Sequence, residues 1–166
     1  MKLNKYNIEE KKYLKKHLSK FCRITKIGSV MCFILIGFFS FSLIGKLPSN
    51  SNLFSIDKLA HVLAYTVLSL CIFLTQALII LERDIENDKL VEIRWGLKPT
   101  IFAFLIGVPL GIVIEVIQGK VGRSFDLLDW RADIIGIGLG CIVAAIIIKI
   151  VIFRGLFKYK ATNLSN

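Results

Sequence analysis

The sequence places titratable side chains directly beside long apolar runs, beginning with DKLAHVLAY at residues 57–65. In this stretch Asp57, His61 and Tyr65 are spaced four residues apart, so on a helix they share one face. Carboxylate, imidazole and phenol groups are the side chains that serve as general acids and bases in enzymes. The spacing therefore indicates a candidate site at the start of an apolar helix, with Lys58 beside it.

Two further polar groups follow in the second half of the chain. Glu115 and Gln118 are spaced i, i+3 near the end of one apolar run, and Asp129 and Asp133 are spaced i, i+4 at the start of the next. Arg123 lies in the short polar segment between these runs. If both runs are helices joined by a hairpin, these side chains gather at one end of the pair.

Glu115 is the most diagnostic of these residues. It lies about one helical turn inside an apolar run, where an unpaired charge costs about 3 kcal/mol in a membrane. We expect Arg123 to be its cation and His61 to be a neighbour.

The sequence thus gives two sets of candidate site residues. The candidate catalytic residues share ionisable side chains: Glu115, His61, Asp57, Asp129 and Asp133. The candidate ligand-binding residues offer a headgroup charge or hydrogen bonds: Arg123, Gln118, Tyr65 and Lys58.

Structural roles compete with these assignments. Asp57 and Asp129 also fit helix N-caps, because acidic side chains are favoured at a helix N-terminus. We expect Lys58 to extend its ammonium toward lipid headgroups. Tyr65 and Trp130 also fit an aromatic belt at the membrane interface.

A metal site would draw on the same residues, because His61, Glu115, Asp129 and Asp133 are ligand types that suit zinc or a harder cation. Only one histidine is available there, however, and the HExxH spacing is absent from the sequence. We therefore assign no metal and leave the cofactor unknown.

Four long apolar runs must position these side chains. The chain of 166 residues is 55% hydrophobic, with a mean hydropathy of +0.67, which is more apolar surface than a soluble domain of this size can bury. Runs of about 20 apolar residues match the hydrocarbon core of a bilayer. The sequence predicts an all-α polytopic membrane protein, a bundle of four transmembrane helices with spans at about 27–45, 59–81, 99–118 and 130–153.

The basic residues set the expected orientation. The net charge is +10, from 22 Lys and Arg against 12 Asp and Glu, and most of the Lys and Arg residues lie in 1–26, 82–98 and 154–166. By the positive-inside rule these segments are cytoplasmic, so both termini are inside and the 46–58 and 119–131 hairpins face outward. The basic N-terminal tail has an alternative interpretation as an amphipathic helix on the membrane surface. Basic residues that flank membrane spans indicate no nucleic-acid partner.

Glycines predict which helices pack together. Gly107 and Gly111 in the third run, and Gly136 and Gly140 in the fourth, lie on the faces that carry the carboxylates. Small residues four apart let helix backbones approach closely. We therefore expect the third and fourth helices to pack antiparallel along these glycines.

The combined pattern resembles the VanZ-like membrane proteins, a family named after an accessory glycopeptide-resistance protein. That family carries Asp-Lys-x-x-His-x-x-x-Tyr, then Glu-x-x-Gln, an Arg, and Asp-x-x-x-Asn-x-x-Gly. The chain matches with DKLAHVLAY, EVIQ at 115–118, Arg123 and DWRADIIG at 129–136, over about residues 28–150. Asp133 stands where the family usually has Asn, which adds a potential negative charge.

The resemblance implies an action on the outer side of the cytoplasmic membrane, since the name-giving member is associated with teicoplanin resistance. In a first hypothesis, a membrane-embedded enzyme acts on a lipid or lipid-linked envelope precursor, with Glu115 or His61 as general acid or base and Arg123 holding an anionic headgroup. In a second, the same cluster binds a lipid headgroup, an antibiotic or an envelope partner without catalysis. A proton or ion pathway is disfavoured, because no acidic residue lies deep in the cytoplasmic half of any span. The oligomeric state is not indicated.

Overall fold

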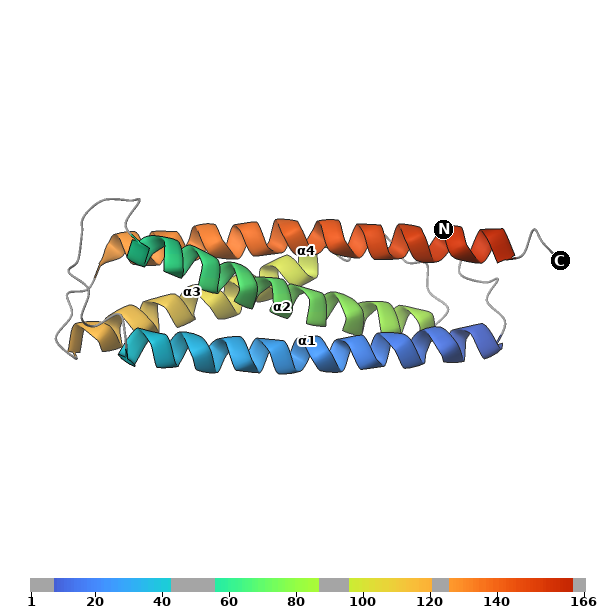
Figure 1. The fold of residues 1–166 in the computed structure, drawn as a ribbon, viewed down its shortest axis with the longest axis horizontal. Coiled ribbons are helices and arrows are strands. Elements are labelled where there is room, and N and C mark those ends of the chain that lie inside the picture. The colour runs from blue at the N-terminus through green and yellow to red at the C-terminus, as the bar shows by residue number, and fades with distance from the viewer. Residues whose placement is uncertain (1–7, 43–55, 87–95, 121–125, 163–166) are drawn as a thin grey trace.

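Four α-helices form the part of the chain that the structure, a computed structural model, describes: residues 8–42, 56–86, 96–120 and 126–162. The helices, labelled in Figure 1, are α1 (Ile8–Ser42), α2 (Ile56–Glu86), α3 (Leu97–Lys120) and α4 (Leu127–Thr162). These ranges contain no strand. The predicted all-α fold is confirmed.

Every helix contains a stretch that is long and apolar enough to cross a membrane. The four stretches are Lys15–Phe38, Ile56–Asp84, Leu97–Lys120 and Leu127–Ile150. They overlap the four predicted spans, because an uninterrupted apolar run of this length has few stable alternatives to a helix in lipid. The chain is therefore a multi-pass membrane protein.

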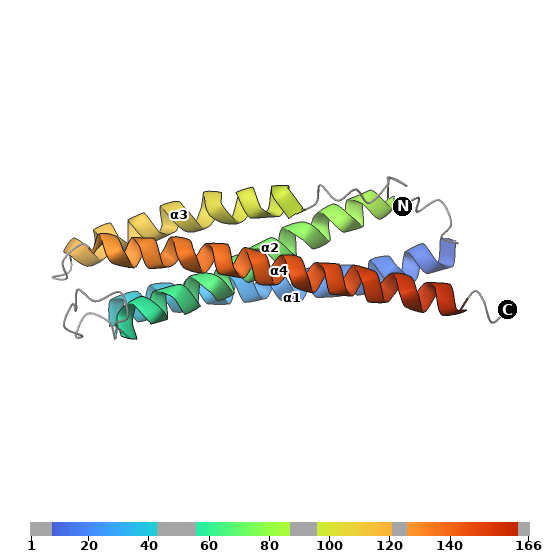
Figure 2. The same ribbon diagram turned by 90° about the horizontal axis from the view of Figure 1, so that it is seen from above.

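Consecutive helices run antiparallel, so α1 begins and α4 ends at the same end of an elongated bundle (Figures 1 and 2). Helix α2 packs against all three other helices, most extensively against α4. Helix α3 packs against α2 and α4 and scarcely touches α1. The start of α2, the end of α3 and the start of α4 consequently lie together at the other end of the bundle.

Helix α1 begins well before the first predicted span. The basic segment 1–26 was predicted to be a tail or a separate surface helix, whereas residues 8–26 continue without a break into α1. Leu18 and Cys22 from this segment are buried in the hydrophobic core. The apolar positions interleaved with the lysines thus continue the packing surface of the span.

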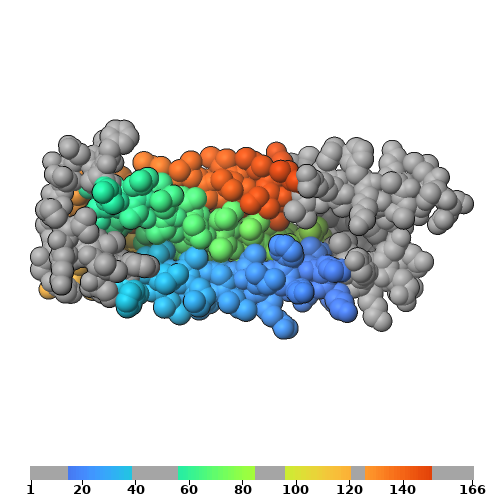
Figure 3. All heavy atoms as spheres, viewed as in Figure 1, coloured from blue at the N-terminus to red at the C-terminus, as the bar shows by residue number. Residues whose placement is uncertain are grey.

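The outside of the bundle is apolar along its length. Large hydrophobic side chains are exposed on every helix, among them Phe33, Leu63, Leu105 and Ile142. Figure 3 shows the side chains of α1, α2 and α4 filling one long face of the molecule. Exposed apolar surface of this extent would be unfavourable in water but is the surface expected to face lipid tails.

The glycines of α3 and α4 contact different partners. A Cβ at Gly107 would lie 2.7 Å from Ile137 Cδ1, so this glycine faces α4 as predicted. A Cβ at Gly140, by contrast, would collide with Ser69 and with the backbone of α2. The prediction that the α4 glycines pack against α3 is therefore wrong, because the two faces of α4 are divided between α3 and α2.

Candidate functional site

The titratable residues occupy one level of the bundle. With a rise of about 1.5 Å per residue, His61 lies about 7 Å from the start of α2 and Asp133 about 9 Å from the start of α4. By the same measure Glu115 lies about 7 Å before the end of α3. Because these three helix ends meet at one end of the bundle, the site lies within the terminal turns of three candidate membrane spans.

Lys58 joins α2 to the start of α4. Its ammonium donates hydrogen bonds to Asp126 Oδ2 at 2.8 Å and to Asp129 Oδ1 at 3.0 Å. Lys58 is only 2% exposed. The prediction that it extends to lipid headgroups is wrong, because two carboxylates hold the ammonium inside the bundle.

Asp126, which was absent from the predicted site, is the N-cap of α4. Its Oδ1 accepts the backbone N–H of Leu128 at 2.8 Å, which satisfies a donor at the start of the helix. Asp129 was a candidate for this role but lies within the first turn. The sequence DLLD at residues 126–129 contains two aspartates that could cap the helix. The first of them, Asp126, directly precedes the apolar residues with which the helix begins, and this position could have identified it as the N-cap.

Glu115 is held at the same helix start. Its Oε2 accepts the backbone N–H of Asp126 at 3.2 Å, and the residue is 1% exposed. Glu115 therefore spans from α3 to the cap of α4. Arg123, the cation expected for Glu115, lies outside the described residues.

His61 and Asp133 form a buried pair across the α2–α4 interface. His61 Nδ1 lies 2.8 Å from Asp133 Oδ1, and the two side chains are 5% and 1% exposed. When Asp133 is ionised, its carboxylate can only accept a hydrogen bond and Nδ1 carries the hydrogen. This contact fixes the orientation of the imidazole ring and turns Nε2 away from Asp133.

Several buried polar atoms of this cluster have no hydrogen-bond partner within the described protein. They come from α2, α3 and α4: His61 Nε2, Tyr65 Oη, Glu115 Oε1, Trp130 Nε1 and Asp133 Oδ2. Leaving such an atom unsatisfied costs about 1 to 3 kcal/mol. These atoms therefore mark a place where water or a bound molecule would be stabilised.

Tyr65 is part of this interior and not of an aromatic belt. The residue is 1% exposed and belongs to the hydrophobic core. The aromatic-belt interpretation of Tyr65 is wrong, because its position at the centre of the helix packing buries the whole ring.

Gly111 brings α3 close to the pair on α2 and α4. A Cβ at this position would lie 2.6 Å from Asp133 Oδ2 and 3.3 Å from Trp130 Cδ1. Only a residue without a side chain lets α3 approach the carboxylate at this distance. The glycine thus helps to bring the polar atoms of three helices together.

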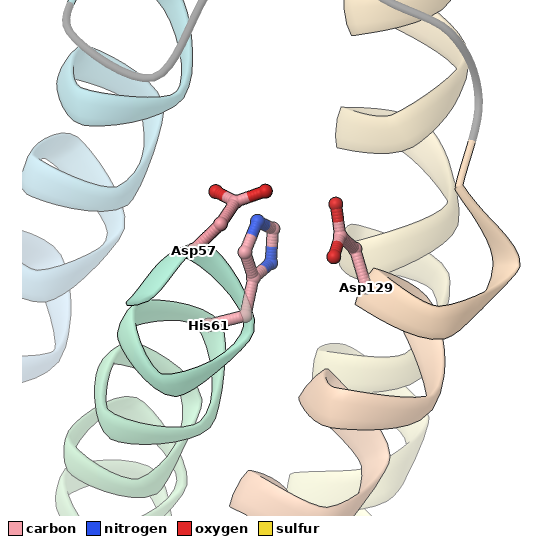
Figure 4. Close-up of side chains that lie close together, drawn as sticks. All are labelled: Asp57, His61 and Asp129. Carbon is pink, nitrogen blue, oxygen red and sulfur yellow. The ribbon is translucent and has the colours of Figure 1, made fainter. Parts of the chain in front are cut away.

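Three side chains of the cluster have the composition of a metal site. One ligand atom each from Asp57, His61 and Asp129 lies within 4.8 Å of the others. Figure 4 shows the Asp57 carboxylate and the His61 ring, both on α2, directed toward Asp129 on α4. These residues overlap in part with the set considered from sequence, which contained Glu115 and Asp133 in place of Asp57.

The remaining predicted residues lie at the same end of the bundle. Gln118 is 3% exposed in the last turns of α3, and Asp57 is half-buried in the first turn of α2. Every described member of the two predicted sets therefore belongs to one region.

The described cluster carries more negative than positive groups. Its carboxylates come from all three helices and from the cap of α4: Asp57, Glu115, Asp126, Asp129 and Asp133. Lys58 and His61 are the basic groups that bind carboxylates in the described cluster. The balance favours a cation, an ammonium or a hydroxyl group over a bare anion.

Comparison with known proteins gives no match: no family model, no curated protein and no solved structure is similar to the chain. The described residues establish a multi-pass membrane protein with four apolar helices. Its polar site gathers a buried lysine, a buried histidine and several carboxylates at one end of the bundle.

Proposed function

We propose that the chain is a VanZ-like protein of the cytoplasmic membrane, and that it acts as an enzyme on a lipid or lipid-linked envelope precursor. The site opens to the extracytoplasmic side, and Glu115 transfers a proton to or from the bound headgroup.

The geometry of Glu115 carries this proposal. One carboxylate oxygen accepts a hydrogen bond from the backbone of Asp126, while Oε1 is buried and has no hydrogen-bond partner among the described residues. A general base needs an oxygen within hydrogen-bond reach of the substrate and a fixed orientation. Glu115 has the fixed orientation, and its Oε1 is available to a bound headgroup within the described residues, which supports proton transfer over a purely structural role.

The charge balance supports a particular kind of headgroup. Because carboxylates outnumber the basic groups, the site suits amine or hydroxyl groups, as in an ethanolamine or amino-sugar headgroup. Tyr65 Oη and Trp130 Nε1 have no hydrogen-bond partner among the described residues, and they supply neutral groups for hydrogen bonds to the same ligand.

The resemblance draws support from burial. The residues that carry the pattern include Lys58, His61, Tyr65, Glu115 and Gln118, and all of them are buried although most are polar. Polar residues within membrane spans are expensive and face the bundle interior where they serve a function. The clustering of these positions supports a shared site as the reason for the pattern.

The outward orientation rests on the basic residues. Most of the Lys and Arg residues lie in 1–26, 82–98 and 154–166, which include the first turns of α1, the last turns of α2 and α4 and the first turn of α3. The described parts of these segments lie toward the end of the bundle opposite the site, and the positive-inside rule assigns that end to the cytoplasm.

Binding without turnover is the second candidate. The ion pairs of Lys58 and the hydrogen bond between His61 and Asp133 occupy much of the cluster and hold α2 against α4. A site whose charges are already paired is suited to recognition of a headgroup with no chemical step.

The experiment replaces Glu115 by Gln, which keeps the shape of the side chain and one oxygen but removes the carboxylate that can gain or lose a proton. In a teicoplanin-sensitive host, wild-type protein should raise the tolerated teicoplanin concentration and Glu115→Gln should abolish the gain. Glu82→Gln is the matched control, because Glu82 lies near the far end of α2. Immunoblots of membranes should show equal amounts of all three proteins.

Mass analysis of the host lipids separates the two candidates. Conversion predicts a headgroup species that forms with wild-type protein and is absent with Glu115→Gln. Binding alone predicts an unchanged lipid that co-purifies with the protein. Full teicoplanin tolerance with Glu115→Gln would exclude proton transfer by this residue.

A further inference from the structure

His61 presents one ring nitrogen that is held in a fixed orientation and has no hydrogen-bond partner among the described residues. Nδ1 is bound to Asp133 Oδ1 at 2.8 Å, whereas Nε2 is buried and has no hydrogen bond within the described protein. The residue is 5% exposed. A buried nitrogen of this kind loses the hydrogen bond that water would supply, so another group must compensate for it.

Two carboxylates lie beside this ring. Asp57 precedes His61 by one helical turn on α2, and Asp129 reaches it from α4. Ligand atoms of the three residues lie within 4.8 Å of one another, and Figure 4 shows them facing a common space. Ligand atoms bound to one zinc ion at about 2.1 Å lie roughly 3.4 Å apart, a spacing that side-chain rotation can reach from here.

From this arrangement we infer a binding site for a divalent cation, Zn²⁺, formed by Asp57, Asp129 and Nε2 of His61. A neutral imidazole that donates Nδ1–H to a carboxylate presents its Nε2 lone pair to the metal, and such a carboxylate is the usual second partner of a metal-bound histidine. Asp133 supplies that partner. One imidazole and two carboxylates are ligands that zinc accepts, and three protein ligands leave a fourth position open.

Lys58 is compatible with a cation at this place. Its ammonium binds Asp129 Oδ1 and Asp126 Oδ2. A carboxylate has two oxygens and about four lone-pair sites, so Asp129 can bind the ammonium and the metal together. The excess of carboxylates in the cluster offsets the added double charge.

The inference goes beyond the proposed function and does not depend on it, because metal binding is measured without any substrate. The competing arrangement is a doubly protonated His61 whose Nε2–H donates to Asp57 or Asp129. That arrangement binds no metal, so the two alternatives predict different zinc contents.

The experiment uses the full chain in detergent, treated with a chelator and then dialysed against a low concentration of Zn²⁺. Elemental analysis should give one zinc per chain. His61→Gln should lose at least tenfold in zinc affinity, and Asp133→Asn should lose about 10- to 100-fold because it weakens the partner of the ligating histidine. His17→Gln is the matched control, because His17 is exposed on α1.

If a variant fails to fold, the site can still be tested in the wild-type protein by substituting Co²⁺ for Zn²⁺, because the visible spectrum of Co²⁺ reports which ligand atoms bind the metal. Cobalt should give the visible bands of a site with nitrogen and oxygen ligands. The four cysteines are free thiols, so binding to them would instead add the charge-transfer absorption of a thiolate. Zinc content equal in wild type and His61→Gln, no bound zinc in wild type, or a thiolate spectrum would each overturn the site.

Discussion

Lys58 shows how a single buried residue organises this site. It is a long basic side chain near a helix end, which in most membrane proteins reaches the interface. Here its ammonium binds two carboxylates of a helix that begins nearly 70 residues later, as the sequence separations of 68 and 71 show. Its position therefore depends on tertiary contacts that local spacing does not encode.

Lys58→Met tests this role. Removal of one member of a buried ion pair leaves the other charges uncompensated, so the free energy of unfolding should fall by about 3 to 5 kcal/mol. Thermal unfolding of the detergent-solubilised protein measures the loss. Lys120→Met is the control, because Lys120 is exposed at the same end of the bundle. Equal stability of the two variants would contradict the buried bridge.

The residues of the candidate site were largely visible in the sequence, whereas their pairing was not. His61, Glu115, Asp129 and Asp133 stand out because polar groups are rare beside apolar runs. Arg123, the cation expected for Glu115, lies outside the described residues, so that pairing stays a prediction. The contacts of Glu115 with the Asp126 backbone and of His61 with Asp133 depend on how the helices rotate against one another, which spacing within one helix does not fix.

At the scale of the helices, the α2–α4 interface depends on glycine. Thr66 Oγ1 donates to the carbonyl of Gly136 at 3.2 Å across this interface. A stripe of small residues predicts close approach but does not identify the partner helix, since any backbone can occupy the groove. The glycine pattern therefore predicted that α4 packs closely against another helix, but it was interpreted as packing against α3. In the structure Gly136 and Gly140 pack against α2.

Gly140→Ala tests the interface. The added Cβ would meet Ser69 Oγ and backbone atoms of Thr66 and Leu70, so we expect a loss of about 1 to 3 kcal/mol in the free energy of unfolding. Gly138→Ala is the matched control on the same helix, because a Cβ there meets nothing within 4 Å. Thermal unfolding of both variants gives the comparison, and similar losses would contradict the close approach of α2 at Gly140.

For the whole molecule, the hydrophobicity of the sequence alone predicted four membrane-spanning helices and their approximate positions in the chain. The apolar runs are long, and the bilayer admits few other structures for them. The start of α1 was less predictable, because lysines interrupt the apolar positions between residues 8 and 26. The orientation across the membrane is a prediction from charge counting, and it can be measured directly.

Cysteine labelling of the two ends of α3 tests the orientation. In a variant whose native cysteines are replaced, Lys120→Cys should react with an impermeant maleimide added to intact cells, because it lies at the end of the bundle that holds the site. Lys98→Cys, exposed in the first turn of the same helix, should react only after the membrane is permeabilised. The reverse pattern would place the site on the cytoplasmic side.

The bridge from Lys58 to Asp126 and Asp129 also has a consequence for biogenesis. The ribosome delivers α2 long before α4, so the lysine and histidine enter the membrane ahead of the acids that neutralise them. Burial of ionised groups in lipid is unfavourable until opposite charges meet. Helix α4 emerges after the other three described helices, so its insertion completes the ion pairs of the site. We expect a nascent chain that is interrupted before α4 to keep Lys58 and His61 in contact with water at the bilayer edge.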